Sequence, residues 1–198
     1  QHARETYTVD LSPAPTQFPI QRNEIIAYSG DTGIGAPHLH YEIREPDERP
    51  VNPRLLGISW PDADAPLVRN IAAVPMEPGA LINGDMLPVK LIVHPQGDGR
   101  YQCEPINARG RLGFAADIID PANEGSNILG IYKISVEANH TELFRIQNDY
   151  LSYQTIRHGT VAWHPYLLDD GMFMTLWRWP GNAAPSYQVS KGDGIFTM

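Results

Sequence analysis

This 198-residue chain has no pair of cysteines, no long hydrophobic run and no excess of basic residues. Each of these absences excludes a kind of structure or partner. The single cysteine, Cys103, excludes a disulfide within the chain. It lies between Gln102 and Glu104, and the sequence gives no reason to expect a general base near its thiol. We therefore expect a structural residue rather than a catalytic thiol. No apolar run approaches the roughly 20 residues of a membrane-spanning helix. The net charge of -8 repels phosphate backbones, so nucleic acid is not an expected partner.

Short apolar runs separated by proline and glycine dominate what is present. Hydrophobic residues make up 42% of the chain, which is ordinary for a globular protein, while 18 prolines and 17 glycines supply frequent turns. No long amphipathic helix and no internal repeat can be recognised. The pattern predicts an all-β fold.

The stretch Trp60–Pro66 is the best candidate for a linker, because it lacks apolar periodicity and its two prolines favour an extended backbone. We therefore expect a first part over residues 1–57, a linker over 58–70 and a second part over 71–198. The second part is long enough for a core of its own. A partial sheet leaves edges and one face open, so we expect the first part to be ordered only by packing on the second part or on another chain.

After Trp60–Pro66, apolar runs recur at the spacing of a β-sandwich. The runs are Val68–Val74, Val89–Val93, Leu112–Ile119, Gly130–Val136, Glu142–Ile146 and Met172–Trp179. Turn signals such as Asn83-Gly84-Asp85, Gln96–Gly99 and Asn123–Ser126 separate them. This arrangement predicts an antiparallel, immunoglobulin-like β-sandwich.

Two histidines in the first part are the strongest candidates for chemistry. The segment His38–Arg44 alternates strictly and predicts a strand, so His38 and His40 are expected to project from the same face. Adjacent imidazoles are hard to satisfy in a core but suit a metal site, where one binds the metal and the other handles protons. A His-x-His pair on a strand is by itself more often structural than metal-binding. The flanking sequence is therefore needed to distinguish the two.

The flanking sequence resembles the closing signature of the lysostaphin-like (LytM-type) zinc metalloendopeptidases. After the glycine-rich Ser29–Gly35, the chain reads Ala36-Pro37-His38-Leu39-His40-Tyr41-Glu42-Ile43-Arg44, and Asn52-Pro53 follows. Upstream, Glu24–Gly30 is similar to the strand that precedes the loop in that family. The likeness covers about residues 5–57 and implies the C-terminal part of a peptidase β-sheet domain, the duplicated hybrid motif of that family.

The resemblance implies a hydrolase that cuts peptide bonds in the stems or cross-links of bacterial peptidoglycan, in the periplasm or cell envelope. It implies Zn²⁺ as cofactor, His40 as a zinc ligand and His38 as the catalytic histidine. Zinc in such sites lowers the pKa of its bound water and polarises the scissile carbonyl. The order of elements in 71–198 is also similar, more loosely, to an accessory domain of some longer members, notably over Gly130–Val136.

The family's other two zinc ligands, in an upstream His-x3-Asp pair, have no counterpart in this chain. The family's further catalytic histidine, in a Tyr-x-His-Leu-like strand, has no counterpart either. The only earlier histidine, His2, has Thr6 where the pair would have an aspartate, and no leucine follows it, so it is expected to be incidental. One ligand cannot hold a catalytic zinc, so we expect a fragment whose site is completed by a missing N-terminal part or by another chain. The alternative is a catalytically incomplete LytM-like module that binds the wall and regulates other wall hydrolases. An upstream His-x3-Asp pair would favour the enzyme.

The remaining histidines and the tryptophans carry weaker expectations. The histidines expected at turns, strand ends or loops on the surface are His94, His140, His158 and His164. The tryptophans of the second part are Trp163, Trp177 and Trp179, and Trp177 and Trp179, two residues apart, are expected to share one strand face. They favour core packing over the alternative of an aromatic platform for glycan or peptide.

Overall fold

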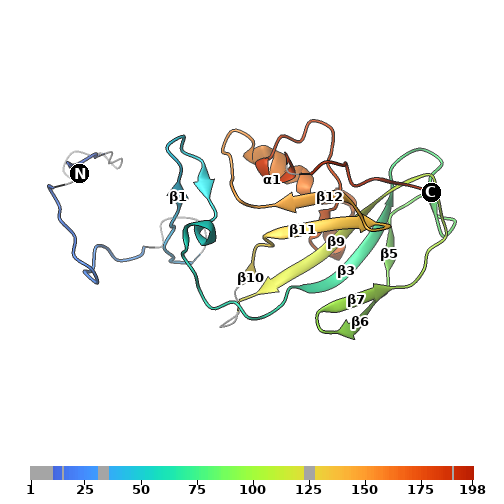
Figure 1. Ribbon diagram of the computed structural model, residues 1–198, viewed down its shortest axis with the longest axis horizontal. Coiled ribbons are helices and arrows are strands. Elements are labelled where there is room, and N and C mark those ends of the chain that lie inside the picture. Colours follow the sequence, from blue (N-terminus) through green and yellow to red (C-terminus); the bar gives the residue numbers. More distant parts are fainter. Residues whose placement is uncertain (1–10, 15, 31–35, 123–127, 189) are drawn as a thin grey trace. The chain divides into compact units, whose positions relative to one another are not determined.

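The computed structural model describes residues 11–14, 16–30, 36–122, 128–188 and 190–198 (Figure 1). The chain divides into two compact units, residues 1–41 and 42–198. Within its described residues the first unit has only turns and bends, and the strands and helices belong to the second. Residues 42–57 therefore share a unit with 71–198, while the division at 58–70 remains a prediction. The residues 58–66 within it form no helix or strand.

The second unit consists of short strands with a few helical turns. The strands are β1 (Ile43–Arg44), β2 (Pro50–Val51), β3 (Leu67–Pro75), β4 (Leu81–Ile82), β5 (Val89–Leu91), β6 (Val93–Gly97), β7 (Arg100–Cys103), β8 (Ala108–Arg109), β9 (Arg111–Pro121), β10 (Ile128–Leu129), β11 (Lys133–Ala138), β12 (Thr141–Gln147), β13 (Phe173–Thr175) and β14 (Phe196–Thr197). The helices are the 3-10 turns η2 (Pro53–Leu56), η3 (Ile156–Ala162) and η4 (Pro165–Asp170), and the short α1 (Pro185–Gln188). All strand pairs of the described residues are antiparallel, which confirms the all-β class. No helix in the described ranges is long and apolar enough to cross a membrane.

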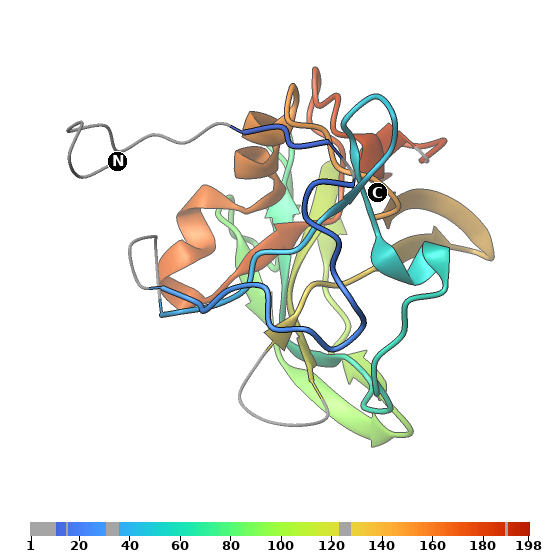
Figure 2. The ribbon, with the colours of Figure 1, turned by 90° about the vertical axis from the view of Figure 1, so that its left-hand side faces the viewer.

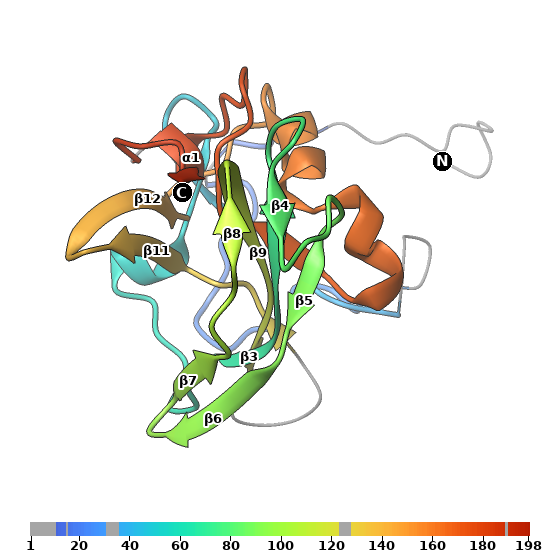
Figure 3. The ribbon, with the colours of Figure 1, turned by 90° about the vertical axis from the view of Figure 1, so that its right-hand side faces the viewer.

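Strand β9 organises the main sheet. The segment Ala115–Asp117 pairs with β3 and also with β13, so these two strands lie on opposite edges of β9. Beyond β3 lies β5, and β10 and β14 pair with the two ends of β9. Two further ladders, β4 with β8 and β6 with β7, are visible in Figure 3. A central strand covered on both faces reads as a continuous apolar run, and Leu112–Ile119 has that character.

Three apolar clusters hold the second unit together. On β3, Ala72 and Val74 face a cluster that contains Phe173 and Trp177, whereas Ala73 faces the opposite cluster with Ile82. This alternation along one strand places the β3–β9 sheet between two cores. The third cluster joins the β11–β12 hairpin to the α1 region through Phe144, Ile146 and Tyr187.

Several expected strands are confirmed by position, and others begin or end elsewhere. The runs Val68–Val74, Leu112–Ile119 and Glu142–Ile146 are strands. By contrast, Gly130–Val136 becomes a strand only from Lys133, and Met172–Trp179 is a strand only over β13. The expected turn at Asn83-Gly84 is present: both residues have positive φ, and Ile82 and Asp85 exchange backbone hydrogen bonds around it.

The expected strand His38–Arg44 is correct only at its end. Ile43 and Arg44 pair with Val51 and Pro50, but His38–Glu42 and the described Glu24–Gly30 have no strand. A strand needs a neighbour to take its backbone hydrogen bonds, and the sequence alternation supplies none. Most of the glycine-rich loop, residues 31–35, lies outside the described residues.

Candidate functional site

The two predicted site residues, His38 and His40, both lie exposed in the first unit, next to its border with β1. The Nδ1 atom of His38 is 2.7 Å from the carbonyl oxygen of Ala36. Because a carbonyl can only accept, Nδ1 carries the proton and donates it. In the neutral ring this leaves the lone pair on Nε2, the atom that would take a proton or a metal.

The described residues do not fit a complete catalytic zinc site. A catalytic zinc normally takes three protein ligands and keeps a fourth position for water or substrate. Within the described ranges, no group of three His, Cys, Asp or Glu side chains converges in a way that could hold a metal ion. Within the described ranges, His38 and His40 are therefore not joined by the further ligands that such a site needs, and no chemical step can be assigned to a metal held by these residues alone.

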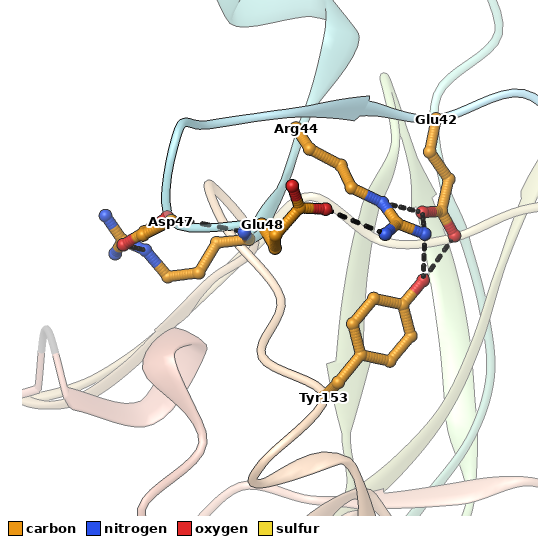
Figure 4. A network of polar contacts seen from close by, with 6 residues as sticks. Glu42, Arg44, Asp47, Glu48 and Tyr153 are labelled. Atoms are coloured by element: carbon orange, nitrogen blue, oxygen red, sulfur yellow. Dashed lines mark hydrogen bonds and ion pairs between the residues drawn. The ribbon is translucent and has the colours of Figure 1, made fainter. Parts of the chain in front are cut away.

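The residues that follow the histidines are fixed to the body of the second unit by a polar network (Figure 4). Tyr153 donates its hydroxyl proton to Oε1 of Glu42 at 2.6 Å, and the guanidinium of Arg44 donates from Nε to Oε2 of the same carboxylate at 2.8 Å. Arg44 also lies over the Tyr153 ring, 5.2 Å from its centroid, and reaches Glu48 at 3.2 Å. The Glu-Ile-Arg end of the motif thus has a structural role.

The electrostatics of this network follow from the single Glu42 carboxylate shared by two donors. The hydrogen bond that each group donates to Glu42 raises the pKa of Tyr153 and the pKa of Arg44, because it stabilises the protonated form of the donor. At neutral pH the tyrosine is therefore a donor and the arginine a cation. Tyr153 is exposed, so solvent screens these interactions and their role is mainly to fix geometry.

The Asn-Pro pair of the motif also has a structural role. The Asn52 side chain accepts from the backbone N–H of Arg54 at 3.1 Å and caps η2, whose first residue is Pro53. The η2 turn is the cyan helical turn in Figure 2. Its amide nitrogen donates to the Asn148 carbonyl at 3.2 Å. One side chain thus starts a helical turn and joins it to the segment after β12.

Backbone contacts complete the attachment of the β1–β2 hairpin. Val51 forms a bridge with Tyr150, and the N–H of Leu151 donates to the Pro50 carbonyl at 2.9 Å. The Arg49 guanidinium lies 4.9 Å from the centroid of the Tyr150 ring. The segment 148–153 therefore holds the hairpin that follows the histidines. Sequence reasoning missed it, because no local pattern links residues about a hundred positions apart.

One histidine expected on the surface is buried. His164 is only 4% exposed, and the expectation of a surface residue is wrong. It precedes η4, where its backbone N–H donates to the Phe173 carbonyl at 2.9 Å and its ring packs near Trp177 and Tyr166. Burial lowers the pKa of His164, so the ring is neutral at pH 7.

Trp177, Cys103 and the other histidines expected on the surface lie on the surface, in turns or in the core. His94 is exposed, 3.6 Å from Glu104, and His140 lies in a turn at positive φ. Nδ1 of His158 accepts the backbone N–H of Ala183 at 2.8 Å. Trp177 is fully buried, as core packing predicts, and Cys103 is half-buried with its pKa raised by burial.

Comparisons of the chain with protein-family models, with curated proteins and with solved structures found no match.

Proposed function

We propose that this chain contributes the His-x-His segment of a zinc metalloendopeptidase that hydrolyses peptide bonds in bacterial peptidoglycan, outside the cytoplasm. In this proposal His40 is a zinc ligand and His38 the catalytic histidine. The observation that carries it is the pair itself: two exposed imidazoles two residues apart, in the signature that resembles the lysostaphin-like family. The hydrogen bond of His38 to Ala36 supports a ring whose Nε2 is free to exchange protons.

The remaining zinc ligands would come from residues beyond the described set, on the same polypeptide or on another chain. The described residues contain no group of three side chains that could hold a metal ion, which supports a site shared with residues outside them. The peptidase part would have the LytM-type fold, and residues 71–198 an immunoglobulin-like sandwich. The sandwich would position the peptidase through the contacts of Tyr150 and Tyr153, or bind the wall polymer.

The test is digestion of purified peptidoglycan by the polypeptide that carries the completed ligand set. Chelator-sensitive release of new amino groups is expected. His40→Ala should lose both metal and activity. His38→Ala should keep most of the metal and lose about 10²–10⁴-fold in rate. The 198-residue chain alone is expected to be inactive, and chelator-sensitive turnover by that chain would contradict the proposal.

A binding module that regulates other wall hydrolases is the second candidate, and the same shortage of ligands favours it. The two candidates differ in one observable. The enzyme requires a His-x3-Asp pair in the polypeptide that completes the site, and the module does not. A completed protein that sediments with peptidoglycan and binds no zinc would support the module.

A further inference from the structure

Two neighbouring cavities of the second unit share Met76 and Trp179 in their linings. One has a volume of about 660 Å³ and the other about 480 Å³. Trp179 follows β13, is half-buried, and packs edge-on against Trp177 with ring centroids 5.4 Å apart. The buried partner holds this indole in place between the two cavities, which have different chemistry.

The larger cavity is apolar. Met86, Leu87 and Tyr166 line it with most of their side chains exposed, Tyr166 at 85%. The buried ring of His164 also lines it, and Nδ1 of that ring has no hydrogen-bond partner within the described residues. Because burial keeps His164 neutral, the ring places no charge against an apolar occupant. Asp170, at the same cavity, is already paired with Lys90 at 2.8 Å.

The smaller cavity is cationic. Arg111 and Arg178 both line it, together with a single acid, Asp193. Arg111 lies 3.7 Å from Asp193, with both side chains about half exposed, and Arg178 forms no ion pair with any described residue. Two guanidiniums against one carboxylate give the lining a net positive charge, in a chain whose net charge is -8. A further carboxylate, Glu77, adjoins the cavity and accepts the backbone N–H of Arg111 at 3.1 Å. Guanidinium groups bind carboxylates with paired hydrogen bonds, so this cavity is suited to a carboxylate.

Cavities of this size, mostly apolar with a few convergent polar groups, are typical ligand sites. We propose that the two cavities together bind the free C-terminus of a peptide whose last side chain is large and apolar. The carboxylate meets Arg111 and Arg178, and the apolar side chain enters the cavity lined by Met86, Leu87 and Tyr166. Trp179 contacts the peptide between the two. The site lies within one unit and does not depend on the histidine pair, so it can fail or hold independently of the proposed peptidase activity.

The test is calorimetric titration of the 198-residue chain with three tripeptides. Alanyl-alanyl-phenylalanine is expected to bind, while its C-terminal amide and alanyl-alanyl-alanine are each expected to bind about tenfold more weakly or not at all. Arg178→Gln and Arg111→Gln should weaken the free acid about tenfold, because each removes a charge-assisted contact. They should leave the residual binding of the amide unchanged.

The matched control is Arg100→Gln in β7, a side chain 74% exposed and outside both cavities. It removes the same charge and should leave binding unchanged. Circular dichroism of each variant establishes that it is folded. Equal affinity for the acid and the amide, or an equal loss in Arg100→Gln and Arg178→Gln, would overturn the proposal.

Discussion

The Tyr153 hydroxyl donates to Oε1 of Glu42 at 2.6 Å, joining residues 111 positions apart in the sequence. Glu42 comes two residues after His40, and Arg44 binds the same carboxylate while it covers the Tyr153 ring. The end of the histidine motif is therefore held by a side chain 111 positions later in the sequence. This contact fixes the residue directly before β1, which begins three residues after His40.

Removing the Tyr153 hydroxyl should loosen the hairpin without unfolding the protein. In Tyr153→Phe, we expect faster hydrogen exchange at two backbone N–H groups. That of Glu45 donates to Arg49 within the β1–β2 hairpin, and that of Leu151 donates to Pro50 and attaches the hairpin to the segment 148–153. Tyr166→Phe, a highly exposed tyrosine outside the network, is the control. Unchanged exchange in Tyr153→Phe would show that the backbone contacts are sufficient.

Gly113 should be intolerant of a side chain. A Cβ atom built on Gly113 lies 2.6 Å from the ring of the fully buried Trp177. We expect Gly113→Ala to lower the free energy of unfolding by about 1–3 kcal/mol through overpacking, as measured by urea denaturation. Gly130→Ala has open space around its Cβ and serves as the control. Equal stability of both variants would mean that Trp177 can move at little cost.

The buried carboxylate of Asp117 depends on its partners. It is 1% exposed and accepts from Arg69 at 2.6 Å and from Asn70 at 3.3 Å. Arg69→Gln should destabilise the protein by about 1–3 kcal/mol, below the full cost of breaking a buried pair, because the Arg69 side chain is partly exposed. Arg100→Gln, which removes an exposed arginine, should change stability by less than about 0.5 kcal/mol. A similar small effect for both variants would refute a structural role for the pair.

Protonation of His164 should destabilise the fold. Its folded pKa is lowered by burial, so the unfolded chain takes up the proton first as the pH falls. The stabilising contribution is complete above the unfolded pKa of about 6.5 and is lost as the pH falls toward the folded value. Urea denaturation at about pH 7.5 and at about pH 5 should show this loss in the wild type and less of it in His164→Gln. Ile82→Val, which removes one methyl group from a different apolar cluster and no titrating group, should keep the wild-type pH dependence.

The strands that the sequence predicted well are those whose residues meet an apolar environment on at least one face. Leu112–Ile119 and Val68–Val74 are such runs, and they pair with each other in the sheet. The segment His38–Glu42 alternates equally well but has no described neighbour, so its pattern alone does not produce a strand. Alternation reports which residues share a face, whereas a strand also requires a hydrogen-bonding partner.

The candidate site was predictable only where local sequence carries the information. His38 and His40 stand out from their spacing and flanking residues. The attachment through Tyr153 and the burial of His164 depend on contacts between distant segments, which no local pattern reports. The cavities on either side of Trp179 likewise combine residues from β3, β9 and the segments around η4 and β13.

The central claim, that His40 is a zinc ligand and His38 is not, is tested most directly by zinc titration of the 198-residue chain with ¹⁵N-labelled histidine. We expect weak binding, because the described ligand set is short, with the largest change in the imidazole resonances of His40. The response should be lost in His40→Ala and kept in His38→Ala. Loss of zinc binding in His38→Ala but not in His40→Ala, or no response from either imidazole at saturating zinc, would contradict the account.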